Sequence, residues 1–159
     1  APFITAIPAD VFGPDSTFVA EDAHVIPSLL ARMHDARRRG LDHLTLWGTG
    51  TPRREFIYAD DLADACLLIM RDYDDETPIN LGAGRVHSIH EVAVLIRDTV
   101  GFRGELRWDS SCADGTPIKW LDTSPLRALG WRPRVSLAEG LAATYRSLRL
   151  AEAAGRRST

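Results

Sequence analysis

Apolar and polar residues repeat along this chain with two periods, which predict short strands alternating with helices. Apolar runs of strand length occupy residues 3–7, 44–47, 55–58, 78–81 and 104–108. Between them, apolar residues recur every three or four positions, the spacing of an amphipathic helix, over 25–39, 60–70, 91–100 and 136–150, with a short helix after residue 122. This alternation predicts an α/β fold.

Local signals predict where the helices begin and end. The stretches 88–91 and 136–139 read Ser-Ile-His-Glu and Ser-Leu-Ala-Glu, which are capping boxes. The acidic pair 60–61 opens another helix, because carboxylates favour the positive end of the helix dipole. Gly40 and Gly101 stand where two periodic segments stop.

The strand-like runs predict where strands lie, but say less about which strands pair with each other. The run 3–7 reads as a strand buried on both faces of a parallel sheet, and no earlier strand supplies its neighbours, which suggests the back half of a larger fold. The runs 44–47 and 55–58 are predicted to form a hairpin. Residues 8–18 and 109–118 are predicted to be loops, and the chain from residue 151 a fraying tail.

The glycine turn 82–84 resembles a dinucleotide-binding fingerprint, but His87 stands at the third glycine position. The following helix begins only at Ser88, too late to hold a pyrophosphate, so the fingerprint is rejected.

Composition narrows the function classes. The 159 residues, 45% hydrophobic and 26% charged, suit one globular domain. A net charge of −3 gives no footprint for nucleic acid or an anionic membrane. The longest apolar run, 65–70, is too short to span a bilayer, and two distant cysteines form no disulfide framework, so a cytoplasmic location is expected. Lys119 is the only candidate for lysine chemistry.

A series of short motifs follows in a fixed order along the chain. They are Pro8-x-x-x-Phe12-Gly-Pro14, His24-Val-Ile-Pro27, Trp47-Gly-Thr-Gly-Thr-Pro-x-Arg54-Glu-Phe56, Asp60-Asp61-Leu-Ala63, Asn80-Leu-Gly-x-Gly84, Asp114-Gly-Thr-Pro-x-Lys119 and Leu129-Gly-Trp131. Together they resemble the C-terminal half of the GDP-L-fucose synthase family, which are extended short-chain dehydrogenase/reductases.

The resemblance implies the last strands of a Rossmann sheet with a small α/β substrate-binding domain. Residues 1–159 form a single unit in which 1–8 and 56–82 contribute to the Rossmann sheet. Residues 9–55 and 83–135 make up the substrate-binding part, and 136–150 the C-terminal helix.

It also implies a reaction: 3,5-epimerisation and 4-reduction of GDP-4-keto-6-deoxymannose with NADPH. The expected partners are a nucleotide-diphosphate sugar, a missing N-terminal half or partner chain, and a second copy in a homodimer. No nucleic acid, membrane or metal is expected.

Family roles transfer to particular residues. His24 matches the catalytic acid and, with the run from Pro8 through Ala9 and Asp10 to Val11, the cofactor-binding positions. Histidine suits proton transfer near neutral pH. The matched substrate contacts are Arg32, Trp47, Arg54, Asp114 and Lys119.

The residues themselves leave other readings open. His24 could satisfy backbone groups at a helix start, Arg32 could lie on a solvated helix face, and Trp47 could be a core aromatic. Arg54 offers a planar fork for phosphate or carboxylate, or belongs to a solvated basic corner.

The family's Tyr-x-x-x-Lys pair has no counterpart, since Tyr58, Tyr73 and Tyr145 are followed four residues on by Leu62, Thr77 and Arg149. The family's glycine-rich loop, catalytic serine and cysteine base also lie ahead of the matched segment, so the chain is expected to lack the hydride-transfer apparatus. Asp10, Ser16-Thr17 and Cys112-Ala113 depart from the family pattern and leave the sugar open. The rival readings are a non-catalytic nucleotide-sugar-binding fragment and a reductase or epimerase of another nucleotide-linked deoxy sugar.

Overall fold

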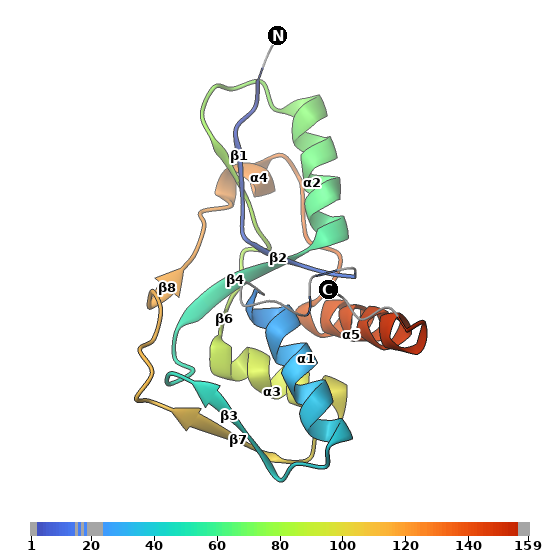
Figure 1. Ribbon diagram of the computed structural model, residues 1–159. Coiled ribbons are helices and arrows are strands. Elements are labelled where there is room, and N and C mark those ends of the chain that lie inside the picture. The colour runs from blue at the N-terminus through green and yellow to red at the C-terminus, as the bar shows by residue number, and fades with distance from the viewer. Residues whose placement is uncertain (1–2, 15, 17, 19–23, 156–159) are drawn as a thin grey trace.

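The computed structural model describes residues 3–14, 16, 18 and 24–155, which form a mixed α/β structure (Figure 1). The helices are α1 (Val25–Arg38), α2 (Ala59–Asp72), α3 (Ile89–Val100), α4 (Ser124–Ala128) and α5 (Leu137–Ala153). The strands are β1 (Ala6–Pro8), β2 (Asp10–Phe12), β3 (His43–Trp47), β4 (Arg53–Tyr58), β5 (Ile79–Leu81), β6 (Val86–Ser88), β7 (Glu105–Asp109) and β8 (Ile118–Lys119).

The strands of the described residues pair in three groups. β1 pairs in parallel with β5, and β3 in parallel with β7. β4 is the centre of the third group: it pairs with β2 in parallel along residues 56–58, and near residues 53–55 it pairs with β6 in antiparallel and with β8 in parallel. β4 therefore has strands on both edges at the position of its two arginines.

Two hydrophobic clusters lie on either side of β4. One joins α1, α3 and α5, and includes Phe56 and Tyr58. The other joins α2, α4 and β5, and includes Ile57. Side chains of a strand alternate between its faces, so a single strand supplies both cores. Figure 1 shows the same division, with α2 and α4 above β4 and α1 and α3 below it.

The helix boundaries confirm the sequence signals. Both capping boxes form in α3 and α5, with each serine accepting from the backbone N–H of the glutamate three residues on. Gly101 ends α3 in the left-handed conformation, at a φ of 72°. The tail prediction was wrong for residues 151–153, which continue α5. None of the helices in the described residues is long and apolar enough to cross a membrane.

Three strand predictions were wrong. β3 and β4 form no hairpin, because β3 pairs with β7 and β4 with other strands. The predicted loop 8–18 contains β2, whose hydrogen bonds to β4 are long-range. The first strand is not buried on both faces: it has one neighbour in the described chain, and Phe3 and Ile7 are 88% and 44% exposed.

Candidate functional site

Two of the predicted substrate contacts, Arg54 and Lys119, lie on the first half of β4 and on the strand β8 paired with it. Arg54 is directly opposite Lys119 of β8 and His87 of β6, so the three side chains project from the same face of the sheet. Within the described part of the chain, neither Arg54 nor Lys119 forms an ion pair. Burial, with smaller contributions from Arg85 and Arg53, lowers the pKa of His87. Arg54 and Lys119 are therefore adjacent cations without an ion-pair partner in the described residues, whereas Glu91 is close enough to His87 to act on it electrostatically.

Arg54 is held in place by backbone oxygens. Only 9% of the residue is exposed, and its Nη1 donates to the carbonyls of Arg53 and Thr116 at 2.8 and 2.7 Å. Its Nη2 and Nε have no hydrogen bond in the described residues. The solvated basic corner is therefore a wrong reading for Arg54, although it suits Arg53, which is exposed.

The loop between β7 and β8 is tied to the turn after β3 by Asp114. Its carboxylate accepts from Thr49 N–H at 2.9 Å and from Thr49 Oγ1 at 2.6 Å. These bonds, the side-chain one first, lower the pKa of Asp114. Gly48 is required beside it, because its φ is +78° and a Cβ atom would overlap the carboxylate. The structure thus brings Asp114 and Trp47 to one turn.

Trp47 and Arg32 are both positioned by β3: Trp47 is its last residue, and Arg32 bonds its backbone. Trp47 is 76% exposed, so its reading as a core aromatic is wrong. Arg32 is half-buried on α1, and its Nη2 donates to the carbonyl of Thr45, two residues before Trp47. Burial lowers the pKa of Arg32, although an arginine remains charged in proteins. Arg32 is therefore fixed against β3 and does not lie on a freely solvated face.

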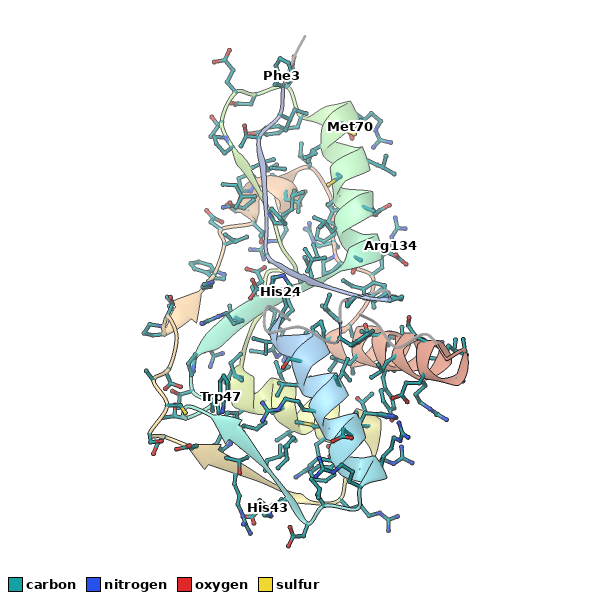
Figure 2. All side chains as sticks on the ribbon, in the orientation of Figure 1. Phe3, His24, His43, Trp47, Met70 and Arg134 are labelled. Carbon is teal, nitrogen blue, oxygen red and sulfur yellow. The ribbon has the colours of Figure 1, made fainter. Side chains whose placement is uncertain are left out.

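His24 stands at the N-cap of α1 and is exposed. Its carbonyl accepts from Ser28 N–H at 3.0 Å, but its side chain makes no cap hydrogen bond. The imidazole is therefore free of the helix-capping role that the sequence left open. Figure 2 shows His24 at the start of α1 and Trp47 on the side of the β3–β7 pair.

The residues matched to the cofactor connect the β1–β5 pair to the sheet that contains β2 and β4. Pro8 ends β1, and the N–H of Ala9 donates to Leu81 of β5 at 2.9 Å. Asp10 and Val11 then pair with β4 in the other sheet. Val11 is 38% exposed, so part of this bridge is open to a ligand.

Glu55 and Trp120 lie at or beside the site, but the sequence analysis did not predict them as site residues. Glu55 is 2% exposed, although it carries a carboxyl group within a strand. The signal was a charged residue inside the apolar run 55–58. Trp120 is 60% exposed and directly follows Lys119, so it adds an exposed aromatic to that segment.

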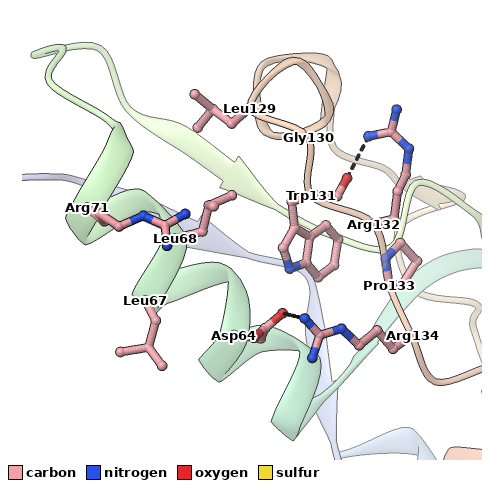
Figure 3. A pocket seen from close by; sticks show the side chains of 10 residues that line it. All are labelled: Asp64, Leu67, Leu68, Arg71, Leu129, Gly130, Trp131, Arg132, Pro133 and Arg134. Carbon is pink, nitrogen blue, oxygen red and sulfur yellow. Dashed lines mark hydrogen bonds and ion pairs between the residues drawn. The ribbon is translucent and has the colours of Figure 1, made fainter.

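A cavity of about 590 Å³ lies away from this site, between α2 and the turn 129–134 (Figure 3). Two of its arginines are already paired: Arg134 with Asp64 at 3.1 Å and Arg71 with Asp72 at 2.7 Å. No predicted site residue lines it.

Known proteins share both the sequence and the fold. The NAD dependent epimerase/dehydratase family profile matches residues 1–82. GDP-L-fucose synthase 1 of Arabidopsis thaliana is 44% identical over 142 residues, which cover 89% of this chain and 44% of that protein. The chain thus spans less than half the length of this relative.

Solved structures of similar fold include proteins with related names. A GDP-L-fucose synthetase from Naegleria fowleri bound to NADP has a TM-score of 0.89 at 29% identity, covering 98% of this chain and 49% of that one. A GDP-D-glycero-L-gluco-heptose synthase from Campylobacter jejuni, solved in the presence of NADPH, has a TM-score of 0.81 at 28% identity, covering 93% and 53%.

Proposed function

Because this chain belongs to the NAD-dependent epimerase/dehydratase family, we propose that it is the substrate-binding half of a GDP-4-keto-6-deoxymannose 3,5-epimerase-4-reductase. The observation that carries the proposal is the placement of Arg54 and Lys119 opposite each other on paired strands, with no carboxylate pairing either in the described residues. Two adjacent cations without a counter-ion suit the diphosphate of a nucleotide sugar.

The other proposed substrate contacts lie on β3, on α1 and in the loop between β7 and β8. Trp47 offers an exposed aromatic plane for the base or sugar, and Arg32 adds a third cation next to β3. The loop that carries Asp114 covers Arg54, because Thr116 takes one of its hydrogen bonds. We propose that this loop closes over the bound sugar, and that a phosphate oxygen bonds the donors Arg54 has left.

The proposed chemistry needs a proton donor on one face of the sugar. His24 takes that role: it is exposed, its side chain makes no cap bond, and an imidazole can both donate and accept a proton. It would return a proton to a carbon beside the ketone after a base on the opposite face has removed one. NADPH, when bound, supplies the hydride that reduces the ketone.

The cofactor's nicotinamide would lie along Pro8, Ala9, Asp10 and Val11. The partly exposed bridge between the two sheets fits this role, because its backbone is open on one side. We propose that most cofactor contacts come from the part of the family's proteins that this chain does not match, since it covers 44% of the Arabidopsis thaliana protein.

The partner that supplies this part would pair with β1. β1 has β5 on one edge and no strand on the other in the described chain. Phe3 and, on α2, Met70 are 88% and 74% exposed. An uncovered strand edge with apolar side chains binds another polypeptide readily. We propose that an N-terminal Rossmann half, or a partner chain, covers it, and that the completed protein is a homodimer.

Calorimetry and reconstitution test the proposal. The chain should bind GDP, and adding the corresponding N-terminal half should give NADPH oxidation with a GDP-4-keto sugar. In that assembly, His24→Asn should suppress inversion more than hydride transfer, measured by solvent deuterium incorporation against NADPH oxidation. Normal inversion in the variant removes His24 from the mechanism.

A second substrate is favoured by a particular observation. The Campylobacter jejuni neighbour is named for a GDP-heptose, and Asp10 places a carboxylate where the family has asparagine. Turnover of a GDP-4-keto-heptose in preference to the deoxymannose derivative would select this alternative. GDP binding without turnover in any reconstituted assembly would select a non-catalytic binding module.

A further inference from the structure

Glu55 is a buried carboxylic acid on β4, and its hydrogen-bond partners come from distant segments of the chain. It is 2% exposed in the middle of β4, and its side chain lies on the face opposite Arg54. A carboxyl group in the interior is costly unless it is hydrogen-bonded. Its partners therefore show what the buried group does.

Both carboxyl oxygens accept from backbone N–H groups of distant segments. Oε1 accepts from Gly84 at 2.6 Å and Oε2 from Leu121 at 3.1 Å. Gly84 belongs to the glycine turn after β5, and Leu121 follows β8. One side chain thus ties the turn 82–84 and the segment 118–121 to β4.

The glycine turn is shaped to admit this carboxyl group. A Cβ atom at Gly82 would overlap Oε1 and lie 2.8 Å from Cδ of Glu55. Gly82 has no positive φ, so the close approach of the carboxyl group, rather than backbone conformation, excludes a side chain there. Gly84, the donor, is left-handed at a φ of +74°. The carboxyl group of Glu55 thus explains the glycine at position 82, and the left-handed backbone explains the glycine at position 84.

The clamped segment carries a residue of the proposed site. Lys119 pairs with Arg54 through the short strand β8, which has two residues. Such a short pairing fixes a segment weakly, and the bond from Leu121 to Glu55 holds it two residues further on.

We infer that Glu55 is a positioning residue for nucleotide-sugar binding: it holds the segment 118–121 so that Lys119 stays beside Arg54. The ligand in this inference rests on the proposed function, whereas the clamp itself does not. Glu55 lies on the opposite face of the strand from Arg54 and acts through Lys119.

Amide hydrogen exchange in the whole chain tests the clamp. In Glu55→Gln the amide NH₂ replaces one acceptor oxygen, so the exchange of at least one of the Gly84 and Leu121 amides should accelerate by roughly tenfold or more. The amide of Phe102, which donates to Arg97 at 3.0 Å, serves as the internal reference and should not change. Unchanged exchange at Gly84 and Leu121 overturns the inference.

Gly82→Ala provides a second perturbation of the same clamp if Glu55→Gln does not fold. The added methyl group should displace the carboxyl group and accelerate the same two amides. The methyl should be tolerated better when Glu55 is also changed to alanine, because the overlap then disappears. Equal destabilisation by Gly82→Ala in both backgrounds would contradict the geometry.

GDP titration separates a positioning role from general stabilisation. Glu55→Gln and Lys119→Met should each weaken GDP binding by about tenfold, and the double variant no more than Lys119→Met alone. Glu105→Gln, at an exposed glutamate of β7, should bind like the wild type. Losses that add in the double variant overturn the inference. A wild-type chain that does not bind GDP refutes the proposed function, and the exchange rates still decide the clamp.

Discussion

Replacing Arg54 by lysine tests whether the reach of its guanidinium, beyond its charge, holds the site together. Arg54 and Arg53 are adjacent in sequence, yet Arg54 is 9% exposed and its guanidinium binds two carbonyls, whereas the guanidinium of Arg53 makes one long hydrogen bond of 3.4 Å to the carbonyl of Val86. A lysine at position 54 keeps the positive charge but lacks the planar set of donors. Both bonds come from Nη1, and the ammonium nitrogen of lysine lies one bond closer to Cα, so we expect a lysine to reach one of the two carbonyl oxygens at most.

The structure sets the magnitude of this loss. A hydrogen bond to a charged group contributes about 1.5–3 kcal/mol. For a chain of this size, each kcal/mol lowers the melting temperature by about 2–4 °C. Losing one bond in Arg54→Lys should therefore lower it by about 3–12 °C.

Calorimetric melting of Arg54→Lys and Arg53→Lys side by side makes the comparison. Arg53→Lys is the matched control, because it changes the same residue type one position away on the exposed face. It should melt within about 1 °C of the wild type. GDP affinity should fall in Arg54→Lys and not in the control. Equal melting temperatures for the two variants would refute the account of Arg54 as a buried anchor.

Three further predictions concern the loop and the core. Gly48→Ala should loosen the Asp114 loop, and hydrogen exchange of the Thr49 amide should become faster. Gly40→Ala is the control, because Gly40 has a similar φ of +66° but no atom near the added methyl group, so the exchange of the Thr49 amide should not change. Because its folded-state pKa is lowered, Asp114 should hold Thr49 above about pH 4 and release it as the pH falls further. The exchange of the Thr49 amide, measured against pH as a protection factor relative to the unstructured chain, follows this release, and a pH-independent protection factor would contradict it. Leu126→Ala, at a fully buried residue of α4, should cost about 2–5 kcal/mol in denaturant unfolding, and a loss below about 1 kcal/mol would refute its placement in the core.

Helix positions were predictable because their signals are local. The bonds of the capping boxes at Ser88 and Ser136 join residues three apart, and both form. The glycine stop at Gly101 is equally local. Periodicity located the helices, although Leu67 and Met70 in the periodic segment of α2 are 67% and 74% exposed.

Strand pairing was not predictable in the same way. The apolar runs 44–47 and 55–58 indicate strands, but they do not identify the neighbouring strand of either. Proximity in sequence favoured a hairpin, whereas the fold pairs β3 with β7, about sixty residues later in the chain. The strands β2, β6 and β8 contain three residues or fewer, too short for a periodic signal.

The sequence by itself determined the helices, their ends, and the residue types available to bind an activated sugar. Only the tertiary structure decided which arginine of the adjacent pair is buried, that Trp47 is exposed, and that Glu55 ties two distant segments to β4. The physical reason is distance along the chain. A helix and its caps are stabilised by bonds between near neighbours, whereas the site depends on bonds such as that from Leu121 to Glu55, 66 residues apart, whose partners the fold must first bring together.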